Sequence, residues 1–328
     1  MNAPVVVVGA GSWGTAFATV LGRAGHAVRL VARDADRADE IRATGMNSRY
    51  LPDVALDGVE IAAHGRSAVA DAEMVVVAVP SRAVVGVCAD LRDDLPPGAG
   101  IVSLSKGLDP ASGDRLSIAI GRAIGDAPLV VVTGPSHAEE VAAGQPTAVV
   151  AGGDDRLVHR LQDLTAGTNL RLYRNDDLVG LEIAAAAKNV IALAAGMADG
   201  LGSGDNAKAA LVTRGLAEMT RLGVVLGARE ATFGGLAGMG DLIATCTSPL
   251  SRNRRAGELI ASGVPPAEIE DRLGQVAEGL VTVENLLATA EAAGVELPIS
   301  AAVQAVVSGE ISVEEALAGL MARTPSAE

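Results

Sequence analysis

The first half of the chain alternates short apolar runs with stretches of helical period. The apolar runs, rich in β-branched residues, are 5–8, 28–32, 74–79, 101–104, 129–133 and 147–151. Runs of this kind are typical of strands buried on both faces of a parallel sheet. Helices are predicted between them at 15–24, 83–95 and 114–124. This alternation predicts an α/β fold, a doubly wound parallel sheet with helices on both faces.

After about residue 178 the pattern becomes helical throughout. Apolar residues spaced 4, 3, 3 and 4 lie on one helix face at Val212, Leu216, Met219, Leu222 and Leu226. Shorter helices are predicted at 254–262, 266–273, 282–293, 299–308 and 312–321. The polar segment 174–177 therefore separates a sheet domain, residues 1–177, from an all-α domain, residues 178–328.

Composition and charge narrow the choice of partners. The chain has 328 residues, 2% aromatic residues and a net charge of -14. A protein that binds nucleic acid or an anionic membrane surface should be basic, so neither partner is expected. A small anionic substrate is still compatible with one local basic pocket. An uninterrupted apolar stretch of about 18 residues is lacking, so no membrane span is expected.

The two cysteines, Cys88 and Cys246, lie far apart and form no cluster with histidine. No metal site and no disulfide framework is therefore predicted. The N-terminus shows no secretion signal. We expect a cytoplasmic protein with two reduced, buried thiols.

A glycine-rich turn follows the first predicted strand and opens a helix. Gly9, Gly11 and Gly14 form the pattern G-x-G-x-x-G, which in this context predicts a Rossmann domain with a dinucleotide pyrophosphate at the helix N-terminus. At the end of the second strand stands Arg33, where an acid would accept the ribose 2′-hydroxyl of NAD. Arg33 suits the 2′-phosphate of NADP, and the adjacent Asp34 weakens that inference, so both cofactors stay open with NADP favoured. The alternative is that Arg33 is a solvated surface arginine.

Lys188 lies on a predicted helix among alanines, which is unusual for a solvated lysine. Burial would lower its pKa toward a range useful for proton transfer. Asp241 is a single acid among glycines and apolar residues, and such an acid needs a partner. Lys188 would serve, and the alternative is that Asp241 is a helix N-cap.

Four further segments carry polar groups. The basic cluster at 248–255 precedes an apolar helical stretch, and its hydroxyl, amide and guanidinium groups could bind phosphate or carboxylate. The alternative is a solvated basic turn. Lys106 and Ser136 each follow a predicted strand and would face the crevice, whereas His137 is interpreted as structural. Segment 275–279 has no evident local purpose.

Together these motifs resemble the NAD(P)-dependent glycerol-3-phosphate dehydrogenases of bacterial type over essentially the whole chain. The matching segments are GAGSWGTAFA at 9–18, NSRYLP at 47–52, SKG at 105–107, GPSHAEEV at 134–141, AKNVIALAAGMADG at 187–200, GDNAKAALVTRGLAEMTRLG at 204–223 and GLAGMGDLIATCTSPLSRNRR at 235–255. The resemblance implies an N-terminal Rossmann domain, a helical C-terminal domain and a substrate between them. His137 departs from the aromatic residue common at this position.

The resemblance also implies residue roles. Lys188 would exchange a proton with the substrate as NAD(P)H reduces dihydroxyacetone phosphate to sn-glycerol 3-phosphate, and Asp241 would hold Lys188. Implied substrate contacts are Lys106, Gly134, Ser136, Lys188, Asn189, Asp241, Thr245, Ser251, Arg252 and Asn253. Implied cofactor contacts are Gly9, Gly11, Ser12, Trp13, Gly14, Arg33, Tyr50, Lys106, Ala138, Arg252, Val276 and Glu278. A supply of glycerol 3-phosphate to phospholipid synthesis and a homodimer are further implications.

Two alternatives use the same features. Reductases of the 3-hydroxy-acid or 6-phosphogluconate type share the Rossmann turn and a helical domain with a lysine, but the basic cluster after GDLIATCTSPL favours a glycerol-phosphate substrate. A dinucleotide-sensing module would bind the cofactor without turnover. Such a sensor would need no proton donor, and therefore no pairing of Lys188 with Asp241.

Overall fold

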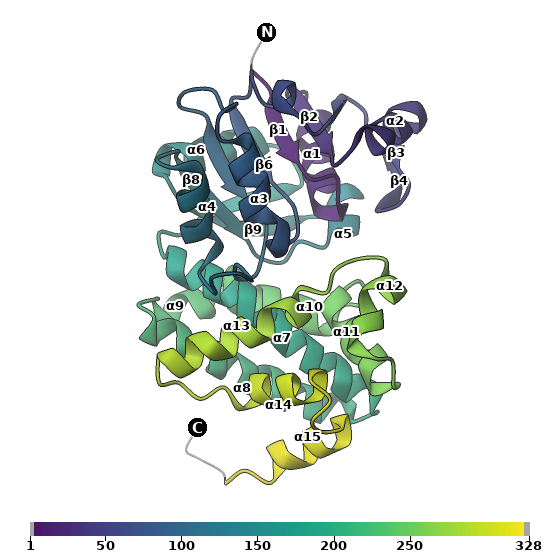
Figure 1. Ribbon diagram of the computed structural model, residues 1–328, viewed down its shortest axis with the longest axis vertical. Helices are drawn as coiled ribbons and strands as arrows, with labels where there is room; N and C mark the ends of the chain where they lie inside the picture. Colours follow the sequence, from purple (N-terminus) through teal and green to yellow (C-terminus); the bar gives the residue numbers. More distant parts are fainter. Residues whose placement is uncertain (1–2, 325–328) are drawn as a thin grey trace.

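The structure is a computed structural model and describes residues 3–324. Figure 1 shows two stacked halves, a sheet with its helices and, below it, a bundle of helices. The sheet has eight strands in the order β10-β9-β8-β7-β6-β1-β2-β5. Its strands are β1 (Val5–Val8), β2 (Val28–Ala32), β5 (Val59–Ala63), β6 (Met74–Val77), β7 (Gly100–Ser103), β8 (Leu129–Thr133), β9 (Thr147–Gly153) and β10 (Leu170–Arg174).

Helices cover both faces of this sheet, as the alternating pattern predicts. They are α1 (Ser12–Arg23), α2 (Ala35–Thr44), α3 (Ser81–Leu91), α4 (Leu116–Ile124), α5 (Ala138–Ala142) and α6 (Asp155–Thr165), with a short 3₁₀ turn η1 (Arg66–Ala68). Successive side chains of a strand point to opposite faces. Accordingly, Val5 and Val7 belong to one apolar core with Phe17 of α1, and Val6 and Val8 to another with Cys88 of α3.

The sheet is parallel except where β9 pairs antiparallel with β8. The predicted parallel sheet is therefore confirmed except at this one pair, and β10 again runs parallel to β9. The segment between β8 and β9 holds only the five-residue helix α5, so the chain turns back instead of crossing over. A small antiparallel pair, β3 (Met46–Asn47) and β4 (Leu51–Ala55), lies outside the main sheet.

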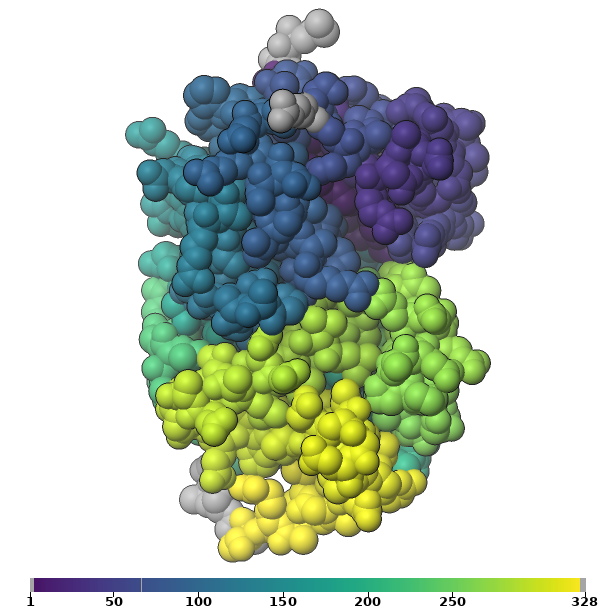
Figure 2. Space-filling view, in the orientation of Figure 1, coloured from purple at the N-terminus to yellow at the C-terminus, as the bar shows by residue number. Residues whose placement is uncertain are grey.

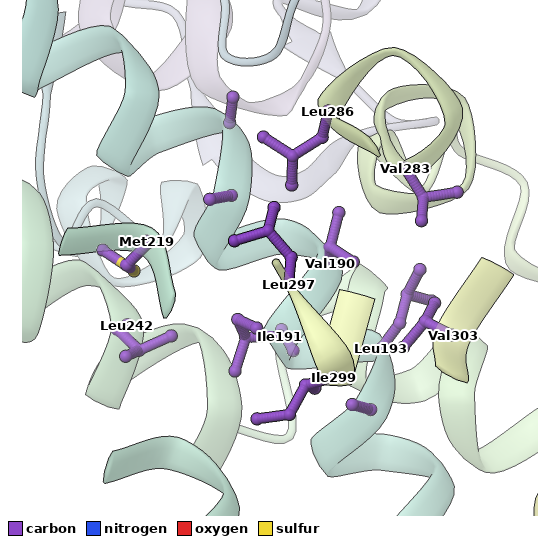
Figure 3. Close-up of a cluster of buried hydrophobic side chains, with 14 of the residues drawn as sticks. Val190, Ile191, Leu193, Met219, Leu242, Val283, Leu286, Leu297, Ile299 and Val303 are labelled. Carbon is purple, nitrogen blue, oxygen red and sulfur yellow. The ribbon is translucent and has the colours of Figure 1, made fainter. Parts of the chain in front are cut away.

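The helical half is built around α7 (Leu178–Gly200). The helices around and beyond it are α8 (Gly204–Val225), α9 (Glu230–Phe233), α10 (Asp241–Thr247), α11 (Arg252–Ala261), α12 (Ile269–Leu273), α13 (Glu278–Ala292), α14 (Pro298–Val307) and α15 (Val313–Met321), with the π-helix η2 (Leu236–Gly240) and the 3₁₀ turn η3 (Pro266–Glu268). Figure 3 shows part of the core they share, which includes Ile191 and Leu193 of α7, Leu286 of α13 and Val303 of α14.

By length and composition α7 could cross a membrane, but 89% of its apolar window is buried inside the protein. It is the core helix of the bundle. Its closest neighbour is α11, because Gly257 has no side chain at the crossing and a Cβ there would lie 2.1 Å from the Leu193 carbonyl oxygen. This close approach brings the first turn of α11 beside the middle of α7.

The two halves meet directly, as the space-filling view shows (Figure 2). Arg82 of α3 forms an ion pair with Glu270 of α12 at 2.6 Å. Arg115, just before α4, pairs with Glu182 of α7 at 2.6 Å. Side chains near the carboxyl ends of the strands therefore face side chains of the bundle.

Candidate functional site

The glycine-rich turn lies between β1 and α1 as predicted. Gly9 has φ +116°, and a Cβ on it would lie 2.4 Å from the Ala78 carbonyl oxygen, so only glycine fits. A Cβ on Gly11 would meet no atom within 4 Å, so the turn is open at that point. The backbone N–H groups at the start of a helix lack intrahelical partners and favour an anion. The turn therefore fits the pyrophosphate of a dinucleotide.

Arg33 follows β2, and its side chain is 93% exposed. Among the described residues it forms an ion pair with the adjacent Asp34, with 3.5 Å between Arg33 Nε and Asp34 Oδ2. The Asp34 carboxylate also accepts a hydrogen bond from the Arg37 backbone N–H at 2.9 Å and so caps α2. This capping role accounts for an acid at this position without a ribose contact.

Two arginines that the sequence reasoning missed flank Tyr50. The guanidinium groups of Arg37 and Arg49 lie 5.9 and 5.4 Å from the centre of the Tyr50 ring. The Tyr50 carbonyl oxygen accepts a hydrogen bond from Ser12 at 3.4 Å. Tyr50 therefore stands beside the glycine-rich turn, between Arg49 of its own motif and Arg37 of α2.

The helical half contributes a buried ion cluster. Lys188 Nζ donates to Asp241 Oδ1 at 2.6 Å and to Thr245 Oγ1 at 2.8 Å. Lys106 Nζ donates to the other carboxylate oxygen, Asp241 Oδ2, at 2.8 Å. The expected pairing of Lys188 with Asp241 is thus present, and a second lysine shares the same carboxylate.

Each member of the cluster is fixed by its element. Lys188 stands in the middle of α7, and Asp241 and Thr245 lie one turn apart on α10. The π-helix η2 leads directly into Asp241, and such helices are frequent at functional sites. Lys106 follows β7 and also donates to the Gly134 carbonyl oxygen at 2.9 Å and to Ser136 Oγ at 3.4 Å.

The cluster shifts the ionisation of its members. The side chains of Lys188 and Asp241 are 5% and 3% exposed. Burial lowers the pKa of Lys188 to about 7, although the Asp241 charge acts in the opposite direction. Burial alone would raise the pKa of Asp241, but the charges of Lys106 and Lys188 outweigh it and hold that pKa below its usual range.

A second polar group adjoins Lys188 on α7. Asn253 of α11 donates to Asn189 Oδ1 at 2.9 Å and accepts from the Gly279 backbone N–H at 2.9 Å. Ser251 is buried, and its hydroxyl accepts a hydrogen bond from the Arg254 backbone N–H, capping α11. The amide and hydroxyl of the basic cluster thus lie at a buried helix start, and the solvated-turn alternative fails for them.

Gln275 connects the two halves. Its Oε1 accepts a hydrogen bond from the exposed Arg252 of the helical half at 3.1 Å and another from Ser12 Oγ of the sheet half at 3.3 Å. Glu278, three residues on, opens α13 and accepts from the Ser81 backbone N–H at 3.0 Å. The 275–279 segment therefore bridges the glycine-rich turn and the helical half, a purpose that its local sequence did not reveal.

The remaining predicted residues make contacts that are mostly apolar or structural. Trp13 lies edge-on to Phe17, with ring centres 6.1 Å apart, and Val276 is half-buried. Ala138 begins α5 and is buried. His137 Nε2 lies 3.2 Å from the Ala244 carbonyl oxygen of α10, a contact that fits its structural interpretation.

Neither cysteine is a candidate nucleophile. Burial raises the pKa of both Cys88 and Cys246 to about 12, so the thiolate does not form near neutral pH. Among residues 3–324, no three side chains of histidine, cysteine, aspartate or glutamate gather as a metal site.

Comparisons with known proteins agree with this geometry. Residues 4–158 and 177–318 match the N-terminal and C-terminal models of the NAD-dependent glycerol-3-phosphate dehydrogenases. Proteins named glycerol-3-phosphate dehydrogenase, NAD(P)+, are similar over most of the chain. The one from Xanthomonas euvesicatoria pv. vesicatoria is 46% identical over 97% of this chain and 94% of its own. That from Halalkalibacterium halodurans is 44% identical over 99% and 95%.

Solved structures give the same result. The glycerol-3-phosphate dehydrogenase of Coxiella burnetii has a TM-score of 0.95 and 36% identity, covering 98% of this chain and 99% of its own. A ketopantoate reductase from Ralstonia eutropha, at 18% identity and a TM-score of 0.61 over 96% and 99% of the two chains, shares the fold alone. The chain belongs to the NAD-dependent glycerol-3-phosphate dehydrogenase family.

Proposed function

We propose that the chain reduces dihydroxyacetone phosphate to sn-glycerol 3-phosphate, reversibly, with Lys188 as the proton donor. The observation that carries this proposal is how the two lysines use their hydrogens. An ammonium group has three N–H donors. Lys106 donates to three acceptors, whereas within residues 3–324 Lys188 donates to two, Asp241 and Thr245. Lys188 therefore keeps one hydrogen for a substrate oxygen.

The chemistry divides between the cofactor and the side chains. A bound nicotinamide cofactor supplies the hydride that reaches C2 of the substrate. Lys188 Nζ donates its proton to the carbonyl oxygen of C2 and becomes neutral, and in the reverse direction it takes that proton back. Its pKa of about 7 suits both directions near neutral pH. Asp241 and Thr245 orient the ammonium group.

The phosphate of the substrate would bind at the start of α11. Ser251 and Asn253 lie at the helix N-terminus with the exposed guanidinium of Arg252 beside them. A helix start and a guanidinium both favour a phosphate. Lys106 would place a second positive charge near the developing oxyanion at C2.

We propose NADP as the favoured cofactor because Arg33 is exposed while Asp34 is engaged as the α2 cap. Division of the chain at residue 177 into a cofactor domain and a substrate domain is part of the same proposal. So are a cytoplasmic location, a homodimer and a supply of glycerol 3-phosphate to phospholipid synthesis.

The test is the loss of absorbance at 340 nm with purified protein, dihydroxyacetone phosphate, and NADPH or NADH in parallel. Oxidation of either cofactor supports the proposal, and the ratio of rates gives the cofactor preference. Turnover with a 3-hydroxy-acid precursor instead would favour the related reductases. Cofactor binding without turnover on any of these substrates would favour the sensing module.

A further inference from the structure

We propose that Glu182 and Asn285 are positioning residues that fasten the 107–115 segment to the helical half and thereby hold Lys106 against Asp241. The proposal rests on the role given above to Lys106. By sequence this segment belongs to the sheet half, because it connects β7 to α4. Its contacts belong to the other half.

The first part of the segment lies against the bundle. Leu108 is 2% exposed and forms part of the same apolar core as the α7 side chains. A Cβ on Gly107 would lie 3.2 Å from Thr282 Oγ1 and 3.4 Å from Glu278 Oε2, so the backbone touches α13 directly. Both residues follow immediately after Lys106, so the lysine is tied to the bundle at its own position in the chain.

Asn285 provides the second attachment. Its side-chain amide donates to the carbonyl oxygens of Asp109 at 3.3 Å and Pro110 at 3.1 Å. One side chain of α13 thus holds two consecutive peptide groups of the segment. A backbone held at two adjacent carbonyls has little freedom to shift along the helix.

Glu182 provides the third attachment, at the far end of the segment. One carboxylate oxygen accepts from the Ser117 backbone N–H at 2.7 Å, and the other accepts from Ser117 Oγ and Arg115, both at 2.6 Å. The Glu182 side chain is 3% exposed. A glutamate of α7 therefore caps the first turn of α4, which belongs to the other half of the molecule.

Backbone hydrogen bonds also join the two ends of the segment, so the segment is held as one unit. Leu108 pairs with Arg115 in an antiparallel bridge. The Asp109 backbone N–H donates to the Asp114 carbonyl oxygen at 2.9 Å, and the Gly113 N–H donates to the Asp109 carbonyl oxygen at 2.8 Å. Anchored at Leu108, Asn285 and Glu182, the segment moves with the bundle, and Lys106 moves with it.

The test uses Glu182→Gln with Glu218→Gln as its matched control. Glu218 is also a buried glutamate of the helical half, and it caps α14 through the backbone N–H groups of Ile299 and Ser300. It does not bond to the 107–115 segment. Both variants lose a buried charge at a helix start, so a purely structural effect should be similar in the two.

We expect kcat/KM for dihydroxyacetone phosphate to fall at least about 10-fold in Glu182→Gln, because a small misplacement of a positioning group is costly. In Glu218→Gln it should fall less than about 3-fold. In a Lys106→Met background, Glu182→Gln should cause little further fall in kcat/KM, because the lysine that Glu182 positions is already lost. Equal losses in the two glutamate variants, or a full additive loss in the Lys106→Met background, would overturn the proposal.

Hydrogen exchange by mass spectrometry gives a readout that needs no activity. Amides of 106–115 should exchange faster in Glu182→Gln than in Glu218→Gln or wild type. If Glu182→Gln does not fold, Asn285→Ala is compared in the same way with Glu284→Ala, an exposed neighbour on α13. Unchanged exchange in 106–115 overturns the proposal. A wild-type protein without turnover would contradict the proposed function but leave this comparison intact.

Discussion

The two halves of the molecule place their functional groups in opposite ways. In the sheet half they lie in loops that follow strands, such as Gly9 after β1 and Arg33 after β2. In the helical half they lie inside helices, such as Lys188 in α7 and Thr245 in α10. Arg33 is 93% exposed, whereas Lys188 is 5% exposed. An open edge suits a large, reversibly bound cofactor, while a lysine whose pKa is lowered by burial suits proton transfer near neutral pH.

The substitution Lys188→Ala tests this difference between the two halves most directly and should have the largest effect. Turnover should fall by roughly 10²-fold or more, because the proton donor is lost. NADPH binding, followed by quenching of Trp13 fluorescence, should stay near the wild-type value, since Lys188 is not among the expected cofactor contacts, most of which lie in the sheet half. Retained turnover would contradict the assignment of Lys188, and lost binding would contradict the separation of the two roles.

Asp241→Asn tests the buried carboxylate. Lys106 and Lys188 would lose their shared counter-charge, and an uncompensated buried charge costs about 3 kcal/mol of the free energy of unfolding. Urea denaturation measures this loss. The matched control is Asp34→Asn, an exposed helix cap where asparagine serves as well as aspartate, and it should change stability by less than about 0.5 kcal/mol. Equal stability of the two variants would mean that the carboxylate does not hold the lysines.

The pH dependence of the rate tests the lowered pKa of Lys188. Reduction needs the protonated lysine, so kcat for reduction should fall as pH rises through about 7. Oxidation needs the neutral lysine, so kcat for oxidation should rise through the same range. Because Asp241 favours the charged lysine, Asp241→Asn should move both limbs to lower pH. If kcat for reduction and kcat for oxidation both rose, or both fell, as pH increases through about 7, a proton transfer by Lys188 would be contradicted.

Arg33→Ala tests the exposed arginine of the sheet half and should have the smallest effect. The KM for NADPH should rise about 10-fold, as expected for the loss of one charge-assisted hydrogen bond, with the KM for NADH unchanged. Arg92→Ala, an exposed arginine after α3, serves as the control. An equal rise for both cofactors would show that Arg33 does not distinguish the 2′-phosphate.

The features that could be predicted from the sequence are those that depend on a local pattern of residues. The glycine-rich turn was predictable because three glycines at fixed spacing follow an apolar strand. The pairing of Lys188 with Asp241 was predictable because each stood alone in apolar surroundings, and the 2.6 Å contact confirms it. The proton-transfer role of the pair and the ligand contacts remain predictions.

The missed features depend on tertiary structure. Lys106 and Asp241 are 135 positions apart, and Ser81 and Glu278 are 197 apart, so no local pattern joins them. The helix α2 went unpredicted because only two of its residues, Ala38 and Ile41, are buried. The edge strand β10 has only Leu170 and Leu172 buried, so it forms no continuous apolar run. The apolar run of β9 resembles those of the parallel strands, so it does not indicate that β9 runs antiparallel to β8.

The buried helix α7 has a consequence for how the protein is made. The ribosome releases the chain from its N-terminus, so this largely apolar helix of 23 residues emerges well before α11 and α13, which cover it. Until residue 292 has left the exit tunnel, the nascent chain carries an apolar helix that is only partly covered. This helix is the segment that a chaperone would shield during synthesis, and a product truncated before α13 would be prone to aggregate.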